Sequence, residues 1–178
     1  MNNFFKNLII TISSSILLFS VIVLTVLWSF SNNIPDYKFL KSYKPPVSSK
    51  VYSGDGTVVA DFSREKRVFV PYESIPENVI NSFLSAEDKN FFNHPGVDAK
   101  GILRAVINNL KNISENKRLE GASTITQQVA KNFLLTNEVS LNRKIKEAIL
   151  AFRIERALSK QRILELYLNQ IYLGSGAY

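Results

Sequence analysis

The feature that most limits how this chain can fold is an apolar stretch near its start. Residues 8–30 contain no charged side chain and are rich in Leu, Ile, Val and Phe. A helix of this length, at about 1.5 Å per residue, can cross the roughly 30 Å hydrocarbon core of a bilayer. Trp28 lies near its end, as interfacial aromatic residues do. A cleaved signal peptide usually has a shorter apolar region and a small-residue cleavage pattern, and no such pattern follows Phe30. We therefore predict an uncleaved signal anchor over residues 8–30, behind a short cytoplasmic tail (1–7).

The charges around this stretch do not by themselves fix its orientation. Lys38, Lys41 and Lys44 follow it, whereas Lys6 precedes it. Counted over short loops, this bias would leave the C-terminal part in the cytoplasm, but long domains translocate largely regardless of such charges. The net charge of +7 suggests an anionic partner. Beside a membrane anchor, lipid head groups fit that partner better than nucleic acid. The chain has no cysteine, which excludes disulfides, thiolate metal sites and cysteine nucleophiles.

A short β element is expected after the anchor. Residues 31–46 are polar and end in Pro45-Pro46, which indicates a stiff linker. Residues 50–52 and 57–62 have strand-like composition and flank Gly54-Asp55-Gly56, so they predict a hairpin. Residues 68–70 are a candidate third strand.

The remainder has helical patterns. Ser74 and Pro76 indicate the start of a helix with a buried stripe of Val79, Ile80, Phe83 and Leu84. Apolar spacing predicts a second amphipathic helix over 102–110, followed by a polar, mobile loop over 114–120. The capping box of Thr124 and Gln127 predicts a helix to about Leu135. Ser140 and Ser159 are caps for helices reaching Leu158 and Leu173. Apolar side chains surround the longer of these two, so it should be buried on several sides: Leu141, Ile145, Ala148, Ile149, Leu150, Ala151, Phe152 and Ile154. The fold class is mainly α.

Two carboxylates stand where the first of these helices should stop. Glu87 follows Phe83 by four residues, so it continues the apolar face and should be partly desolvated, which makes a carboxylate a better proton acceptor. The alternative is a solvated helix end paired with Lys89. This segment alone does not decide between them.

Four sequence blocks together decide between these two interpretations of Glu87. Residues 87–96 read EDKNFFNHPG, 121–128 read GASTITQQ, 143–147 read RKIKE, and 160–169 read KQRILELYLN. In this order and at these separations they resemble the peptidoglycan glycosyltransferases of glycosyltransferase family 51, found in class A penicillin-binding proteins and monofunctional wall polymerases. The resemblance covers residues 47–178 and implies a lysozyme-like helical domain. It implies a domain outside the bacterial cytoplasmic membrane that polymerises lipid II with inversion and releases undecaprenyl pyrophosphate.

The chemistry of such a transfer suits the residues at hand. A carboxylate must take the proton of the incoming hydroxyl, and cations, hydrogen-bond donors or a divalent metal must balance the charge of the pyrophosphate. Pyrophosphate leaves as an anion without a strong general acid, whereas a glycosidase needs one. A candidate base and recurring cations therefore favour transfer over hydrolysis.

The resemblance assigns roles residue by residue. Glu87 would be the general base and Glu147 the second essential carboxylate, aiding donor orientation or binding a divalent cation such as Mg²⁺ or Mn²⁺. Nine further positions would bind substrate or support the base: Asp88, Arg104, Ser123, Thr124, Gln127, Gln128, Lys131, Arg143 and Lys144. His94 is the single histidine, so a structural role is expected and no zinc site can be completed. The partners implied are lipid II, the growing glycan strand, the membrane and other cell-wall synthesis proteins.

Two departures keep alternatives open. Val139 stands where many relatives carry an arginine thought to contact the phosphates, and the chain ends at Tyr178 inside a segment that continues into further helices in the family. We therefore expect a C-terminally incomplete domain. The alternatives are a non-catalytic, membrane-tethered fragment and a lysozyme-like peptidoglycan hydrolase.

Overall fold

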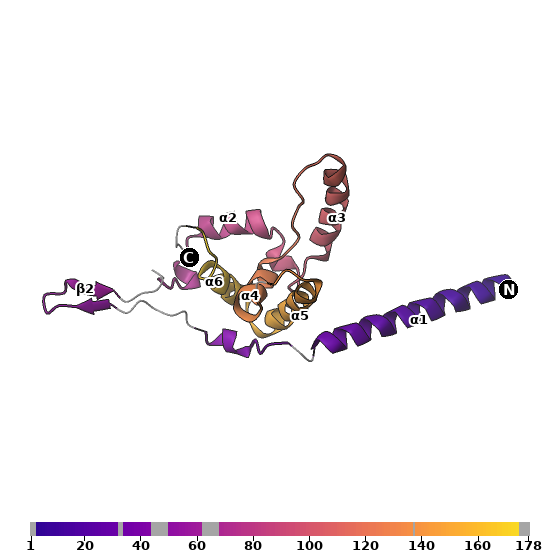
Figure 1. The fold of residues 1–178 in the computed structure, drawn as a ribbon, viewed down its shortest axis with the longest axis horizontal. Coiled ribbons are helices and arrows are strands. Elements are labelled where there is room, and N and C mark those ends of the chain that lie inside the picture. The colour runs from indigo at the N-terminus through magenta and orange to yellow at the C-terminus, as the bar shows by residue number, and fades with distance from the viewer. Residues whose placement is uncertain (1–2, 32–33, 44–49, 62–67, 137, 175–178) are drawn as a thin grey trace. The chain divides into compact units, whose positions relative to one another are not determined.

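The chain forms two compact units, Met1–Pro35 and Asp36–Tyr178, which are described separately. The structure is a computed structural model that describes residues 3–31, 34–43, 50–61, 68–136 and 138–174 (Figure 1). The first unit holds one helix, α1 (Asn3–Ser31). Its segment Phe5–Ser31 has a mean hydropathy of 2.5 and is long and apolar enough to cross a membrane. The predicted apolar helix is therefore present and extends towards the N-terminus beyond Leu8.

The second unit is mainly helical, with one small sheet, as the sequence predicted. Its elements, in chain order, are η1 (Lys38–Lys41), β1 (Lys50–Tyr52), β2 (Val58–Asp61), η2 (Tyr72–Ser74), α2 (Glu77–Glu87), η3 (Phe91–Asn93), α3 (Ala99–Ser114), α4 (Ile125–Leu134), α5 (Leu141–Ala157) and α6 (Lys160–Leu168). Strands β1 and β2 pair antiparallel, with Val51 opposite Ala60. Gly56 has φ +84° in the connecting turn, a conformation that glycine adopts without steric cost.

The predicted third strand over 68–70 is wrong. The backbone of Val70 pairs with a side chain, because its N–H donates to Asn169 Oδ1 (2.8 Å) and its carbonyl accepts from Asn169 Nδ2 (2.9 Å). Helix α6 ends at Leu168, five residues before the predicted end at Leu173. Asn169 is its C-cap, and its amide donates to the carbonyl of Glu165 (2.8 Å). An amide side chain thus replaces a strand partner and ends the helix.

Most helix starts follow their predicted caps. Thr124 and Gln127 form both bonds of the capping box, and the hydroxyls of Ser140 and Ser159 accept from the third N–H of α5 and α6. Ser74 does not cap α2. It closes the 3-10 turn η2, and Pro76 takes the N-cap position.

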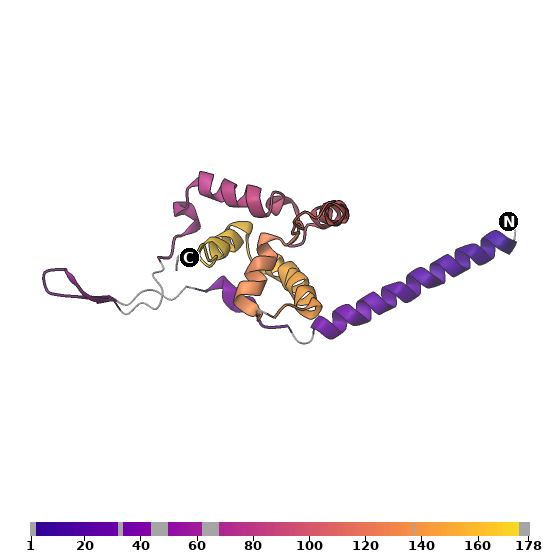
Figure 2. The same cartoon turned by 45° about the horizontal axis from the view of Figure 1, so that its top comes forward.

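The core lies between α4, α5 and α6. Helix α4 packs against both of the others (Figure 2). On α5 the buried face is formed by Glu147, Leu150, Ala151 and Ile154, whereas Leu141 and Phe152 are exposed. The prediction that α5 is covered on several sides holds for residues 145–151, all of which are buried or half-buried, but not for Leu141 and Phe152.

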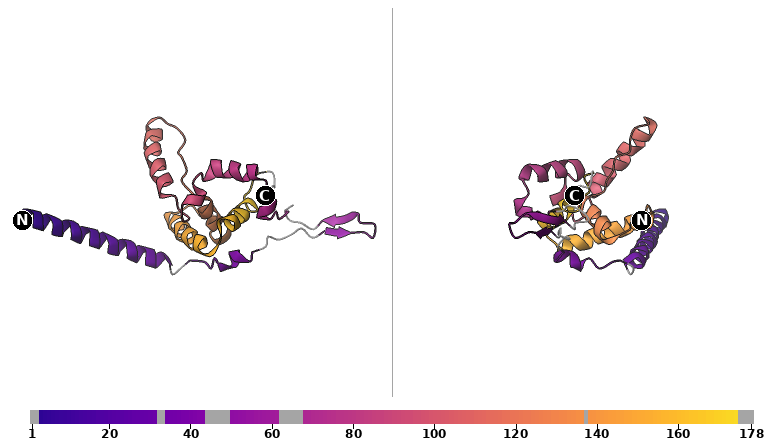
Figure 3. Two further views of the ribbon diagram at one scale, coloured as in Figure 1. Left: turned by 180° about the vertical axis from the view of Figure 1, so that it is seen from behind. Right: turned by 60° about the vertical axis from the view of Figure 1, so that its left-hand side comes forward.

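Helix α3 keeps its apolar face in solvent. It extends away from the group of α4, α5 and α6 (Figure 3). Its apolar stripe is 40% to 68% exposed, namely Ile102, Leu103, Val106, Ile107, Leu110 and Ile113. The amphipathic spacing predicted the helix correctly, but none of the described residues covers that stripe.

Part of the predicted linker contacts the helical unit. Leu40 in η1 is completely buried, and Arg162 Nη2 donates to the carbonyls of Leu40 (3.1 Å) and Tyr43 (2.6 Å). The ring of Tyr43 meets Phe133 edge-on at 4.9 Å. The Pro45-Pro46 pair lies outside the described residues.

Candidate active site

Glu87 is the last residue of α2 and its side chain is exposed. The amide of Gln128, on α4, donates to Glu87 Oε2 at 2.8 Å. The expected desolvation of Glu87 is wrong, because its side chain is exposed and only Ile80 of the α2 stripe is buried. The carboxylate is therefore accessible and is oriented from α4.

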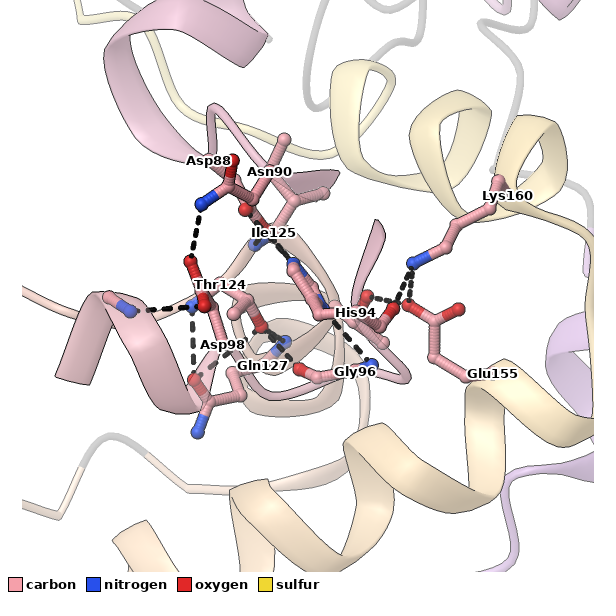
Figure 4. A network of polar contacts seen from close by, with 12 residues as sticks. Asp88, Asn90, His94, Gly96, Asp98, Thr124, Ile125, Gln127, Glu155 and Lys160 are labelled. Carbon is pink, nitrogen blue, oxygen red and sulfur yellow. Dashed lines mark hydrogen bonds and ion pairs between the residues drawn. The ribbon is translucent and has the colours of Figure 1, made fainter. Parts of the chain in front are cut away.

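Asp88, the next residue, is the buried carboxylate, with 6% of its surface exposed. Its Oδ2 accepts the N–H of Ile125 at 3.0 Å, in the first turn of α4, and both of its oxygens lie 3.0 Å from His94 Nε2 (Figure 4). The adjacent residues Glu87 and Asp88 thus both bind α4, which fixes the end of α2 against that helix.

The hydrogen bonds of His94 define its tautomer. The N–H of Gly96 donates to Nδ1 at 3.1 Å, so Nδ1 carries no proton and Nε2–H is the donor to Asp88. His94 is buried and belongs to the scaffold, as its isolation in the sequence predicted. It links the Asp88 carboxylate to the turn at Gly96.

The turn at Gly96 fits tightly against α5. Gly96 has φ +100°, and a Cβ at this position would lie 2.7 Å from the backbone C and O of Ala151. Its carbonyl accepts the hydroxyl of Thr124 at 2.6 Å. A glycine is needed here both for the backbone conformation and for the close approach.

Lys160 holds the same turn from the other side. Its ammonium donates to the carbonyl of His94 (2.8 Å) and to Glu155 Oε1 (2.7 Å), and lies 4.3 Å from the centre of the Phe91 ring. Glu155 also accepts the hydroxyl of Thr126, on α4, at 2.6 Å. A lysine in the first turn of a helix opposes the helix dipole, so these contacts must offset that cost.

Glu147 forms a second carboxylate site, on α5. It is 1% exposed, and its two oxygens accept from Arg143 Nη1 and from Lys144 Nζ, the latter at 2.6 Å. Lys144 also donates to the hydroxyl of Ser123 at 2.6 Å. Arg143 and Glu147 thus form an ordinary i,i+4 ion pair, and the Glu147 carboxylate orients both Arg143 and Lys144.

These groups surround a cavity of about 740 Å³. Cations outnumber carboxylates in its lining: Lys89, Arg104, Arg118, Lys131, Arg143 and Lys144 against Glu87, Asp88, Glu120 and Glu147. Low-dielectric walls focus such a charge imbalance, so the cavity suits an anionic ligand.

The sequence-predicted site residues come together here with one exception. Thr124 is 2% exposed, acts as the N-cap of α4 and lines a small adjoining hollow instead. Asp88 lines the cavity, but its carboxylate is bound to His94 and Ile125. Val139, at 92% exposed, is not among the residues that line the cavity.

Sequence reasoning missed Arg118 and Glu120. Two asparagines of α3 bind the backbone of this segment: Asn109 exchanges two hydrogen bonds with Glu120 (2.7 and 3.0 Å), and Asn112 donates to the carbonyl of Arg118 (3.2 Å). Asn108 donates to Glu120 Oε2 at 2.7 Å. This bond, helped by the charge of Arg104, lowers the pKa of Glu120. The repeated Asn residues of α3 were the sequence signal that could have indicated where Arg118 and Glu120 are held.

Binding of a divalent cation was the alternative role expected of Glu147. Within the described ranges no group of three or more His, Asp or Glu side chains converges. In the structure both oxygens of Glu147 are bound by Arg143 and Lys144 instead.

Comparisons with a family model and with individual proteins agree with each other. Residues 55–178 match the family model described as Transglycosylase. Penicillin-binding protein 1A of Rickettsia felis is 57% identical over 153 residues, which is 86% of this chain and 19% of that protein. The proteins of the same name from Rickettsia bellii (51% over 177 residues, 98% and 22%) and Aquifex aeolicus (47% over 173 residues, 97% and 23%) are similar along nearly the whole chain. The chain spans about a fifth of the length of these relatives.

Proposed function

The chain belongs to the transglycosylase family, and from that premise we propose that it is a membrane-anchored peptidoglycan glycosyltransferase that extends glycan strands from lipid II. Family membership supports the reaction class, and relatives named penicillin-binding protein 1A support a role in the cell wall. The helix α1 supports attachment to a membrane. We place residues 47–178 on the outer side of the bacterial cytoplasmic membrane because the family resemblance implies that orientation.

One observation carries the proposal. An exposed carboxylate, Glu87, is held by Gln128 at the edge of a cavity whose lining is otherwise dominated by cations. A base beside a set of cations is what a hydroxyl acceptor and a pyrophosphate donor require. A glycosidase needs a second carboxyl group as a protonated general acid, and Glu147 does not fit that role because it is paired with Arg143 and Lys144.

The proposed step is a displacement at an anomeric carbon. Glu87 takes the proton of the acceptor's 4-hydroxyl while that oxygen bonds to the anomeric carbon of the growing strand. The bond from this carbon to the pyrophosphate oxygen breaks, and its electron pair leaves with undecaprenyl pyrophosphate. Attack from the opposite face inverts the configuration.

The cations balance the charge of the leaving group. Glu147 holds Arg143 and Lys144, and Lys144 reaches Ser123, so these side chains are fixed before substrate arrives. Charged groups that need no reorganisation stabilise a developing charge best. Arg104 and Arg118 also line the cavity and supply further cations, whereas Val139 does not line it.

The test is Glu87→Gln in the full chain, reconstituted in detergent with lipid II. We expect glycan polymer to fall by at least 100-fold, because general base catalysis contributes about 10²–10⁴. Glu77→Gln, at the first turn of the same helix and outside the cavity lining, is the matched control and should keep full activity. Polymer formation by Glu87→Gln at the wild-type rate would remove Glu87 from the mechanism.

The same preparation separates the alternatives. Incubated with finished peptidoglycan, a hydrolase releases soluble fragments, and a glycosyltransferase does not. A non-catalytic module binds lipid II without producing polymer or fragments.

A further inference from the structure

Tyr167 carries a buried hydroxyl that makes no hydrogen bond. The residue lies in α6, is 1% exposed, and its Oη has no partner among the residues that the structure describes. Leaving a buried donor unpaired lowers stability, and a phenylalanine would fill the same space without that loss. An unsatisfied polar group in a core therefore calls for a functional reason.

The position of the ring suggests one. Tyr167 meets Phe83 edge-on, with ring centres 6.1 Å apart. Phe83 precedes Glu87 by one helical turn on the same face of α2, so the phenol lies beneath the turn that carries Glu87. Burial raises the pKa of the Tyr167 phenol, and the negative charge of Glu87 raises it further. The hydroxyl thus remains protonated and is a donor within electrostatic reach of the carboxylate.

We propose that Tyr167 is a positioning residue whose hydroxyl donates to the Glu87 carboxylate in the working position of the base. This rests on the proposed function of Glu87. Tyr167 is not among the residues that line the cavity, so it acts on Glu87 from behind and does not touch substrate. Gln128 holds Oε2 on the cavity side. Exposed side chains change rotamer within nanoseconds, and the proposal requires Glu87 to exchange between the two donors by rotating its own side chain.

Other groups also act on Glu87 and stay constant in the test. They are Gln128 and Lys131 from α4, Arg143, Lys144 and Glu147 from α5, Asp88 and Lys89 beside it, and Arg104, Arg118 and Glu120 from α3 and the segment after it. Removing the phenol alone changes none of these charges.

The experiment is Tyr167→Phe in the full chain, compared with Tyr43→Phe, whose ring packs on Phe133. A tyrosine that only fills space predicts an unchanged kcat. We expect Tyr167→Phe to raise Tm by a few degrees, because the unpaired hydroxyl is gone, while kcat falls about tenfold and KM stays within about twofold. Loss of activity together with a gain in stability cannot come from a purely structural role. A wild-type kcat in Tyr167→Phe would overturn the proposal.

The wild-type chain is the reference that separates the two proposals. If the wild-type chain makes no polymer, the proposed function fails. If it makes polymer and Tyr167→Phe does so with the same kcat, only the positioning role of Tyr167 fails.

Discussion

The cavity is bounded by two sides that are held in different ways. The packed side consists of α4, α5 and residues 88–96, and its members share a dry core in which Val129, Leu150, Ala151 and Ile154 are completely buried. The stitched side consists of α3 and residues 115–121, joined by asparagine side chains while the apolar face of α3 stays exposed. Apolar burial stabilises more than exposed polar contacts, so the two sides should differ in stability.

This difference bears on the chemistry. Arg143 and Lys144 are anchored on a buried carboxylate of the packed side. Arg104, on the stitched side, has a side chain that is 58% exposed and pairs with Glu120 at 3.2 Å. Exposed ion pairs contribute little and exchange partners readily. We therefore infer that the packed side fixes the reacting groups and the stitched side adapts to the substrate.

The largest effect is expected where the packed side is tightest. Gly96→Ala adds a Cβ 2.7 Å from the backbone of Ala151 at φ +100°, so it should lower the free energy of unfolding by about 4 kcal/mol, from strain and overpacking together. Gly121→Ala, on the stitched side, meets nothing within 4 Å and should change it by less than about 0.5 kcal/mol. Urea unfolding of the full chain in detergent, followed by circular dichroism, measures both. Equal losses would contradict the comparison.

A matched pair of leucines tests burial directly. Leu150→Ala removes a completely buried side chain of α5 and should cost about 3 kcal/mol. Leu110→Ala removes one that is 68% exposed on α3 and should cost under about 0.5 kcal/mol. The same unfolding measurement applies. A cost for Leu110→Ala close to that for Leu150→Ala would mean that the α3 stripe is covered in solution.

Lys160→Met tests the polar part of the packed side. It keeps the apolar stem over Phe91 but removes the donor to the His94 carbonyl and one of the two donors to Glu155, so we expect a loss of about 2 kcal/mol. The control Lys111→Met breaks only an exposed 4.0 Å pair with Glu115 on the stitched side and should stay within about 0.5 kcal/mol. Thermal unfolding compares them. If Lys160→Met proves neutral, the ammonium does not hold the turn.

The smallest effect concerns the start of α3. Asp98 accepts the N–H of Gly101 at 3.0 Å as the N-cap, and this bond, together with Asn90, lowers the pKa of Asp98. Asp98→Ala should cost about 1 kcal/mol at neutral pH. Because the pKa is lower in the folded chain, the contribution of the charge is present above the ordinary Asp value of about 4 and is lost as pH falls through the lowered value.

The pH dependence of unfolding checks this sign. The stability difference between wild type and Asp98→Ala should shrink as the solution is acidified below about pH 4. Asp98→Asn keeps a capping oxygen without the charge, so it should cost less and show no such dependence. A difference that grows on acidification would refute the assignment.

The local elements of this chain could be predicted because they depend on neighbours in sequence. The capping box of Thr124 and Gln127, the caps Ser140 and Ser159 and the hairpin turn at Gly56 are all formed as predicted. The cavity residues Glu87, Gln128, Lys131 and Glu147 were found through sequence blocks whose order reflects one family. The prediction of a third strand was wrong, because the partner of Val70 is a side chain 99 residues away in the sequence.

What the sequence determined by itself is therefore the set of elements, the membrane-type helix and the residue types of the site, since periodicity, caps and motifs are local properties. Tertiary structure alone decided which carboxylate is buried, as Asp88 is and Glu87 is not, and which apolar stripe is covered, as that of α5 is and that of α3 is not. It also brought Tyr167 of α6 against Phe83 of α2. The physical reason is that burial depends on which helices meet, and spacing along one helix carries no information about its partner.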